Sequence, residues 1–259
     1  MNIVVCVKQV PDTGSERTLR LADSTVDREG TDALINVLDE YAIEEGLRLA
    51  EAHGGEVTIM TMGPARASES IRKALSMGAD KAVHIVDDGL AGSDAPATSE
   101  AIAAALGRIE FDLVILGSES TDARMGVLAA MLAERLGLPQ MSLASEVEVD
   151  GQVIRIHRQA DYGYDKVEAS LPAVVSVVEK INEPRYPSFK GIMAAKKKPV
   201  ETLSLADLGI DPARVGLAAS GTEVVSFAKR PPRQGGTIIK DDGDGGEKAA
   251  EFLAAQKFI

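Results

Sequence analysis

The stretch VTIMTMGPARASESIRKALSMGADKAVHIV, residues 57–86, contains one complete strand–helix–strand unit. Residues 57–62 form an apolar run of strand length, and residues 68–77 have helical spacing and end before a glycine. Residues 82–86 form a second apolar run. Two parallel strands require such a helical crossover, which is right-handed. The stretch therefore predicts a parallel sheet covered by helices.

The same alternation continues on both sides of this unit. Residues 3–7 are almost continuously apolar, which is typical of a strand buried on both faces of a parallel sheet. Further helices are expected at 37–53, 97–106 and 126–136, and further strands at 112–116 and 171–178. The Asp150-Gly151 pair lies between apolar residues and indicates a hairpin. The pattern predicts an α/β, doubly wound, mainly parallel sheet with an antiparallel extension.

The C-terminal part of the chain shows no such pattern. Residues 182–199 combine three prolines with a basic cluster, and the chain is expected to remain irregular to about residue 246. Residues 247–259 have the spacing of a short amphipathic helix. We therefore predict an α/β domain at 1–199 and a long C-terminal arm at 200–259.

Composition excludes several classes of protein. The chain has 259 residues, 45% of them hydrophobic, and a net charge of -12, which disfavours nucleic acid as a partner. No apolar run approaches the roughly 20 residues of a membrane helix, so membrane insertion is not expected. The single cysteine excludes an internal disulfide. These features, and an N-terminus without signal-peptide character, predict a cytoplasmic protein.

No self-sufficient active site emerges from the side chains. The three histidines are scattered without metal-ligand spacing, and Cys6 lies in an apolar strand where a small buried side chain is expected rather than a reactive thiol. Ligands of open α/β sheets bind at the carboxyl ends of strands. The loop GSESTDARMG at 117–126 occupies such a position and could hold a phosphate through backbone amides. A solvated strand–helix turn explains these residues equally well.

Four segments of the chain resemble the β (small) subunit of electron-transfer flavoproteins. They are VKQVPDT at 7–13, IRKALSMGADKAVH at 71–84, LPAVVSV at 171–177 and NEPRYPSFKGIMAAKKK at 182–198. The last segment is the most specific, because no general structural rule requires it. The resemblance extends over nearly the full length and implies an adenine-nucleotide-binding type of sheet.

The resemblance also implies cofactors and their contacts. An α subunit would hold most of the redox-active FAD, and this chain would bury one AMP structurally and have no catalytic residues of its own. The implied cofactor-binding residues are Cys6, Asn36, Val37, Leu38, Asp39, Met62, Gly117, Ser118, Ser120, Thr121, Asp122 and Gly126.

Partners are implied in the same way. The heterodimer would accept electrons from flavin dehydrogenases, such as the acyl-CoA dehydrogenases of fatty acid oxidation, and pass them to the respiratory chain through a membrane-associated quinone oxidoreductase. A protruding loop at 184–195 would recognise the dehydrogenase, with Phe189 where the family commonly has an aliphatic anchor. The implied partner-binding residues are Arg185, Phe189, Ile192 and Met193. Whether Arg185 supports the loop or approaches the flavin stays open.

Two alternatives compete with this interpretation. An electron-bifurcating flavoprotein subunit would bind a second FAD in place of AMP. A stand-alone nucleotide-binding protein of the universal-stress type would share the α/β core but leave the long C-terminal segment unexplained.

Overall fold

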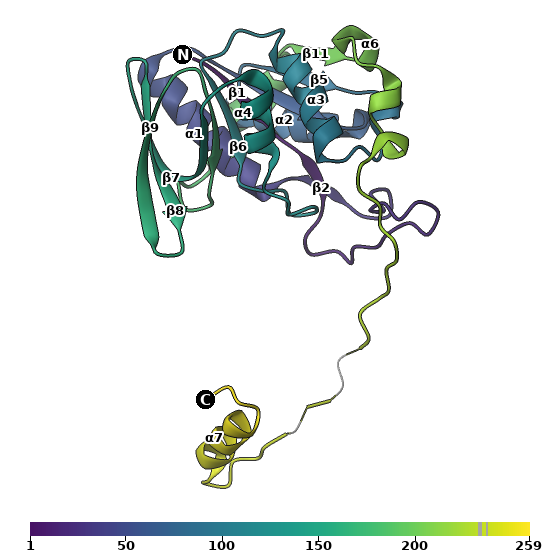
Figure 1. Cartoon of the computed structure of the whole chain (residues 1–259). Helices are drawn as coiled ribbons and strands as arrows, with labels where there is room; N and C mark the ends of the chain where they lie inside the picture. Colours follow the sequence, from purple (N-terminus) through teal and green to yellow (C-terminus); the bar gives the residue numbers. More distant parts are fainter. Residues whose placement is uncertain (233–234, 237) are drawn as a thin grey trace. The chain divides into compact units, whose positions relative to one another are not determined.

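The structure, a computed structural model, describes residues 1–232, 235–236 and 238–259. It contains a large compact unit, Met1–Val224, and a small unit, Val225–Ile259. Figure 1 shows a central sheet with helices on its two faces in the large unit.

Nine strands form the sheet of the large unit. In spatial order they are β11 (Val200–Leu203), β5 (Lys81–Ile85), β4 (Glu56–Met62), β1 (Asn2–Cys6), β6 (Leu113–Gly117), β10 (Ala173–Val177), β7 (Gln140–Asp150), β8 (Val153–Ala160) and β9 (Gly163–Ser170). The strands from β11 to β7 pair in parallel, and β8 and β9 pair antiparallel at one edge. The predicted mainly parallel sheet with an antiparallel extension is confirmed.

Helices cover both faces of this sheet. One face packs against α1 (Val37–His53), α2 (Ser68–Met77) and α5 (Phe189–Ala195). The other packs against α3 (Ala95–Leu106), α4 (Leu128–Leu136) and α6 (Leu205–Leu208). This two-sided arrangement is the doubly wound fold that the sequence predicts.

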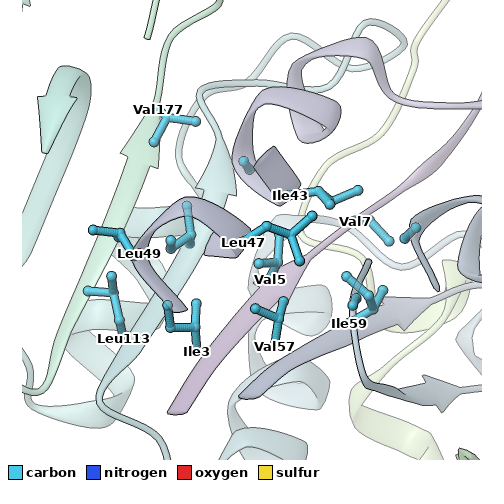
Figure 2. Packing of buried hydrophobic residues seen from close by; sticks show 14 of the residues in the cluster. Ile3, Val5, Val7, Ile43, Leu47, Leu49, Val57, Ile59, Leu113 and Val177 are labelled. Carbon is cyan, nitrogen blue, oxygen red and sulfur yellow. The ribbon is translucent and has the colours of Figure 1, made fainter. Parts of the chain in front are cut away.

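The hydrophobic core consists of two layers, one on each face of the sheet, and strand β1 contributes side chains to both. Ile3 and Val5 face the layer of α1 and α2, whereas Val4 and Cys6 face the layer of α3 and α4, because successive side chains of a strand point to opposite faces. Figure 2 shows Ile3 and Val5 among the buried residues of the first layer. Burying one such aliphatic side chain contributes roughly 1.5–3 kcal/mol, so β1 is stabilised by packing on both of its faces.

Several elements differ from the sequence prediction. The segment expected to be irregular after residue 199 begins with β11, which pairs with β5, and continues with α6. Leu203, Leu205 and Ile210 in this region are buried in the core. The chain between β1 and α1 contains two short strands, β2 (Gln9–Pro11) and β3 (Ala33–Ile35), which pair antiparallel and were not predicted. The compact unit therefore extends to residue 224 rather than 199.

The small unit consists of an extended segment and one helix, α7 (Gly245–Ala255). The sequence predicts a helix over 247–259, so its existence is confirmed and its end is four residues earlier. In α7 and the residues that follow it, all of them described, four large apolar side chains are exposed: Phe252, Leu253, Phe258 and Ile259. An isolated helix of this length is only marginally stable in water, because most helical stability in proteins comes from packing an apolar face. The exposed apolar side chains of α7 can supply that stability by packing on another surface.

Candidate functional site

The strand order reverses between β1 and β6, which are neighbours at the centre of the sheet. The chain reaches β4 and β5 on one side of β1, and β6 and β10 on the other. In doubly wound sheets the crevice at the carboxyl ends of the two strands at this switch point is where ligands bind. Here those ends are Cys6 and Gly117, so the candidate site is bounded by the segments that follow them.

Asn36 connects helix α1 to the loop after β6. Its side-chain Nδ2 donates hydrogen bonds to Asp39 Oδ1 at 2.9 Å and to the carbonyl oxygen of Glu119 at 2.9 Å, and its Oδ1 accepts from the backbone N–H of Thr121 at 3.1 Å. Asn36 occupies the N-cap position of α1 but makes no side-chain cap bond to the helix. The residue therefore links the loop after β6 to the first turn of α1.

Asp39 is a buried carboxyl group at the centre of these contacts. Its Oδ2 accepts from the backbone N–H of Lys8 at 2.8 Å, its Oδ1 accepts from Asn36, and the backbone of Gly117 also donates to it. Burial raises the pKa of Asp39 to about 7, and the donated hydrogen bonds only partly offset this effect. Asp39 thus joins the ends of β1 and β6 to the first turn of α1.

Asp122 is held by two cations from the N-terminal part of the chain. Its Oδ1 lies 2.8 Å from Lys8 Nζ and its Oδ2 lies 2.6 Å from Arg28 Nη2. Burial favours a higher pKa, but the charges and hydrogen bonds of Lys8 and Arg28 outweigh it and hold the pKa of Asp122 well below its usual range. Lys8 Nζ also donates to Ser120 Oγ at 3.3 Å.

One polar atom in this loop is buried and without a partner in the part of the chain that the structure describes: Thr121 Oγ1. Such a group costs about 1–3 kcal/mol unless a ligand or water satisfies it. Helix α4 begins a few residues later without a side-chain cap, after Gly126 at φ 63°. Uncapped helix N-terminal N–H groups bind phosphate. A hydroxyl and free backbone donors on one loop fit the phosphate or ribose of a nucleotide.

The close approach of Gly117 to α1 explains the glycine at this position. A Cβ here would lie 2.5 Å from Asp39 Oδ1 and 2.8 Å from the backbone carbon of Leu38. The structure thus brings Leu38, Asp39 and Gly117 together.

The other expected cofactor residues are placed around the same strand ends. Cys6 is buried, and burial raises the pKa of its thiol to about 12, so its side chain is a neutral packing group. Met62 ends β4 and is half-buried, and Val37, on the first turn of α1, is exposed. The Ser118 N–H donates to the carbonyl oxygen of Val177 at 2.9 Å and so belongs to the sheet.

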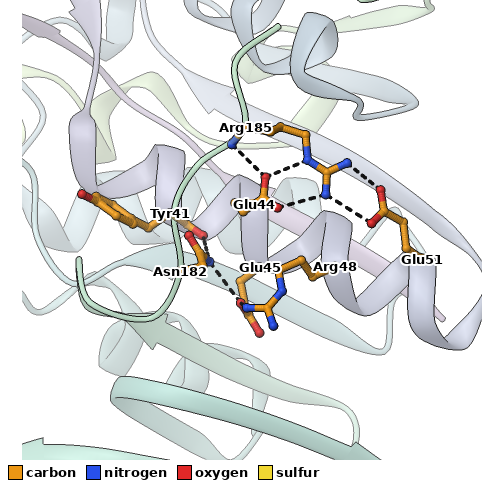
Figure 3. A network of polar contacts seen from close by, with 7 residues as sticks. All are labelled: Tyr41, Glu44, Glu45, Arg48, Glu51, Asn182 and Arg185. Atoms are coloured by element: carbon orange, nitrogen blue, oxygen red, sulfur yellow. Dashed lines mark hydrogen bonds and ion pairs between the residues drawn. The ribbon is translucent and has the colours of Figure 1, made fainter. Parts of the chain in front are cut away.

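A second candidate site lies in the segment 182–198, which is fixed to helices α1 and α2. Figure 3 shows the α1 contacts: Asn182 Nδ2 donates to the carbonyl oxygen of Tyr41 at 3.1 Å and to Glu45 Oε2 at 3.0 Å, and Arg185 binds Glu44 and Glu51. The side chain of Arg185 thus binds two carboxylates of its own chain and supports the loop.

The rest of this segment packs against α2. Gly191 approaches so closely that a Cβ would lie 2.4 Å from the carbonyl oxygen of Ser76. Lys198 Nζ donates to the carbonyl oxygens of Leu75, Gly78 and Ala79 at 3.0, 3.1 and 2.5 Å, which satisfies the C-terminal end of the helix. The expected protruding loop is therefore partly a helix, α5, with fixed ends.

The outer face of α5 is apolar and exposed. Phe189 is 82% exposed, Ile192 46% and Met193 50%, and their spacing of three and four residues places them on one side of the helix. Contiguous exposed apolar groups of this kind mark interaction surfaces. We call these three residues the α5 face.

Comparison with known proteins identifies the chain. Residues 23–208 match the family model described as the electron transfer flavoprotein domain. A protein from Mycobacterium leprae named electron transfer flavoprotein subunit beta is 53% identical over 264 residues, which cover 100% of this chain and 99% of that protein. The chain belongs to the electron transfer flavoprotein β-subunit family.

More distant members of the family are also similar over most of the chain. The β subunit of Thermoanaerobacterium thermosaccharolyticum is 37% identical and covers 92% of this chain and 92% of its own length. A protein of Acetobacterium woodii named caffeyl-CoA reductase-Etf complex subunit CarD is 36% identical with the same coverage. Electron transfer is the role of this family, which confirms the predicted role in electron transport.

The described residues contain neither a cluster of metal ligands nor a helix that could cross a membrane. Across residues 1–232, 235–236 and 238–259, no group of three or more His, Cys, Asp and Glu side chains is arranged to hold a metal ion. Within the same residues no helix combines the length and apolar character needed to span a bilayer.

Sequence reasoning missed the basic residues that cover the candidate nucleotide site of this β subunit. Lys8 and Arg28 bind Asp122, and Arg17 Nη1 donates to the carbonyl oxygen of Thr121 at 2.6 Å. Lys8 lies within the VKQVPDT segment, but its partner is 114 residues away. An ion pair at that separation leaves no local pattern in the sequence.

Proposed function

We propose that the chain is the β subunit of a heterodimeric electron-transfer flavoprotein that binds AMP structurally and supports an FAD held mainly by its α subunit. The heterodimer accepts electrons from flavin dehydrogenases, such as acyl-CoA dehydrogenases, and passes them to a membrane-associated quinone oxidoreductase of the respiratory chain. It works in the cytoplasm. The buried, unpartnered hydroxyl of Thr121 at the switch point of the sheet is the observation that supports the nucleotide.

The residues of the site fit the phosphate of an adenylate. Asp122 is already neutralised by Lys8 and Arg28, so the loop can approach an anionic phosphate without an uncompensated negative charge. In our proposal Thr121 and the backbone at the start of α4 hold the phosphate, and Asn36 holds the loop in place. AMP then acts as a structural ligand, which stabilises the folded chain by mass action.

The α5 face supports the partner proposal. Its three apolar side chains are exposed although Asn182, Arg185 and Lys198 fix the segment to the body of the chain. A rigid apolar face loses little conformational entropy on binding, which is typical of a preorganised docking surface. We propose that flavin dehydrogenases bind here, with Phe189 as the anchor.

An electron-bifurcating subunit is the second candidate. The relative named as a subunit of the caffeyl-CoA reductase-Etf complex, at 36% identity, shows that the family includes members of larger redox complexes. In that case a second FAD would occupy the switch-point site. We favour AMP because the proteins named simply as β subunits include the 53% identical relative. Family membership argues against a stand-alone stress-type protein.

Nucleotide analysis of the purified heterodimer separates these candidates. We expect acid extraction and chromatography to recover one FAD and one AMP per heterodimer, because only one of the two sites is proposed to hold flavin. Thr121→Val removes the unpartnered hydroxyl and is expected to lower the AMP content while the FAD content remains unchanged. Recovery of two FAD and no AMP would establish the bifurcating alternative, and an AMP content unaffected by Thr121→Val would contradict the assigned contact.

The small unit at 225–259 is proposed to bind the α subunit through its exposed apolar side chains, which include Phe252 and Phe258. The proposal is restricted to residues after 224, because β11 pairs with β5 and Leu205, Ile210 and Val215 pack in the core of their own chain. Permanent complexes commonly bury about 2,000 Å² or more, and apolar surface of this kind contributes to such an area.

We expect residues 225–259 to resist limited proteolysis in the heterodimer. The measurement is the cleavage rate followed by mass spectrometry, with the double variant Phe252→Ser/Phe258→Ser as the comparison, because loss of both rings should release the helix and accelerate cleavage. Rapid cleavage of the unmodified tail while the heterodimer stays intact would refute this placement.

A further inference from the structure

Glu44 is a buried carboxylate that binds both the backbone and the side chain of Arg185. The backbone N–H of Arg185 donates to Glu44 Oε2 at 3.1 Å, and the guanidinium donates through Nε to Oε2 at 2.7 Å and through Nη2 to Oε1 at 2.9 Å. The side chain of Glu44 is 8% exposed. A carboxylate buried to this degree requires a paired cation, so the contact is strongly specified.

Glu51 extends the same contact along helix α1. Arg185 Nη1 lies 2.5 Å from Glu51 Oε1, and Nη2 lies 3.2 Å from Glu51 Oε2. Residues seven apart in a helix lie on the same side, two turns from each other. The guanidinium therefore lies along α1 between two carboxylates, as Figure 3 shows. Because Glu44 binds both the backbone and the side chain of Arg185, it fixes the position and the direction of the chain at this residue.

The segment that leads from Arg185 to the α5 face has little freedom. Pro184 and Pro187 flank the dipeptide Arg185-Tyr186, and proline fixes φ near −65°. Ser188 then caps α5, because its Oγ accepts from the backbone N–H of Gly191 at 3.0 Å. A short helix needs two fixed points to have one orientation, and here these are the contact of Gly191 with α2 and the Arg185 contact with α1.

We infer that Glu44 is a positioning residue for electron acceptance: by binding the backbone and the guanidinium of Arg185, it holds the α5 face in the orientation that a flavin dehydrogenase recognises. The inference rests on the proposed docking function of the α5 face and adds to it a residue that does not itself contact the dehydrogenase. Glu51 makes a smaller contribution of the same kind, because its side chain is 61% exposed and its ion pair is screened by solvent.

The test uses the heterodimer as the electron acceptor of a flavin dehydrogenase, with the heterodimer concentration varied. Glu44→Gln keeps the shape of the side chain and removes its charge. We expect the KM for the heterodimer to rise roughly five- to tenfold, with kcat at saturation and FAD content unchanged, because charged hydrogen bonds are lost outside the electron-transfer site. Glu100→Gln is the matched control, since Glu100 is a helical carboxylate that binds Arg214 elsewhere and should leave KM unchanged.

Glu44→Gln is also measured in the Phe189→Ala background. A residue that positions Phe189 loses its influence once the ring is absent, so Glu44→Gln should raise KM in the wild-type background and have little further effect in the Phe189→Ala background. A purely structural role would raise KM to the same extent in both backgrounds, and that result would overturn the inference. If Glu44→Gln does not yield a heterodimer, Glu51→Gln serves in its place, with an expected rise of roughly twofold that also depends on Phe189.

The outcomes separate the inference from the function on which it rests. If Phe189→Ala raises KM and neither Glu44→Gln nor Glu51→Gln does, the docking function stands and the positioning role fails. If none of the three variants changes KM, the proposed docking function fails as well. Hydrogen–deuterium exchange of the 184–195 peptides provides the structural readout, and faster exchange in Glu44→Gln without a change in KM would also contradict the inference.

Discussion

Phe189→Ala in the heterodimer is expected to raise the KM for electron acceptance from a flavin dehydrogenase about 30-fold. Phe189 is the largest and most exposed side chain of the α5 face, at 82% exposure. Truncation of an apolar anchor at the centre of an interface costs about 2 kcal/mol or more, and about 1.4 kcal/mol corresponds to a factor of ten. The flavin and AMP contents should remain at wild-type values, because the ring does not contact the nucleotide segments described above.

The comparison variant for this prediction is Tyr162→Ala. Tyr162 is an aromatic residue of similar exposure, 79%, and lies at the turn between β8 and β9 instead of on the α5 face. Its removal should leave KM unchanged. Equal effects of the two substitutions would show that the loss is not specific to the α5 face, and loss of flavin in Phe189→Ala would show that the segment has a structural task instead.

The buried carboxyl of Asp39 predicts a pH dependence of stability with a definite sign. Its pKa is about 7 in the folded chain and near 4 in the unfolded chain, so the folded state binds one more proton between these values. The contribution of protonated Asp39 to the free energy of unfolding is fully present below pH 4 and is lost as the pH rises through 7. The difference amounts to about 4 kcal/mol in the free energy of unfolding, most of it lost above pH 5.

Asp39→Asn should remove this dependence, because the amide does not ionise. The measurement is the urea midpoint of the heterodimer at pH 5, 6, 7 and 8, and the wild type should lose stability relative to the variant as the pH rises. Asp122→Asn is the control, because the pKa of Asp122 is lowered and its contribution is lost only as the pH falls below about 4. Parallel curves for wild type and Asp39→Asn would contradict the prediction.

Much of the fold could be predicted because its signals are local. Helix α1 spans residues 37–53, as its periodicity predicts, and β1 is buried on both faces, as its continuous apolar run predicts. The hairpin between β7 and β8 follows from Asp150-Gly151. In each case, the pattern that forms the element lies within the element itself.

The elements that escaped prediction depend on partners distant in sequence. β11 has four residues, too few for a periodic pattern, and exists because β5 offers a free edge. Helix α5 follows two prolines, which predict irregular chain, and is fixed by the contact of Gly191 with α2. The topological rule predicts a candidate nucleotide site at the strand ends, whereas the ion pairs of Lys8 and Arg28 with Asp122 depend on tertiary contacts that no local pattern reveals.

In the segment 182–198, the residues that hold the segment and those that form its exposed face are different. Asn182, Arg185 and Lys198 bind the body of the protein, whereas the α5 face makes no comparable contribution to the core. Mutation can therefore change the side chains of the face without a large loss of folding stability. If the proposed docking function holds, a change of electron donor requires substitutions at the three positions of the α5 face alone and leaves the anchoring residues Asn182, Arg185 and Lys198 unaltered.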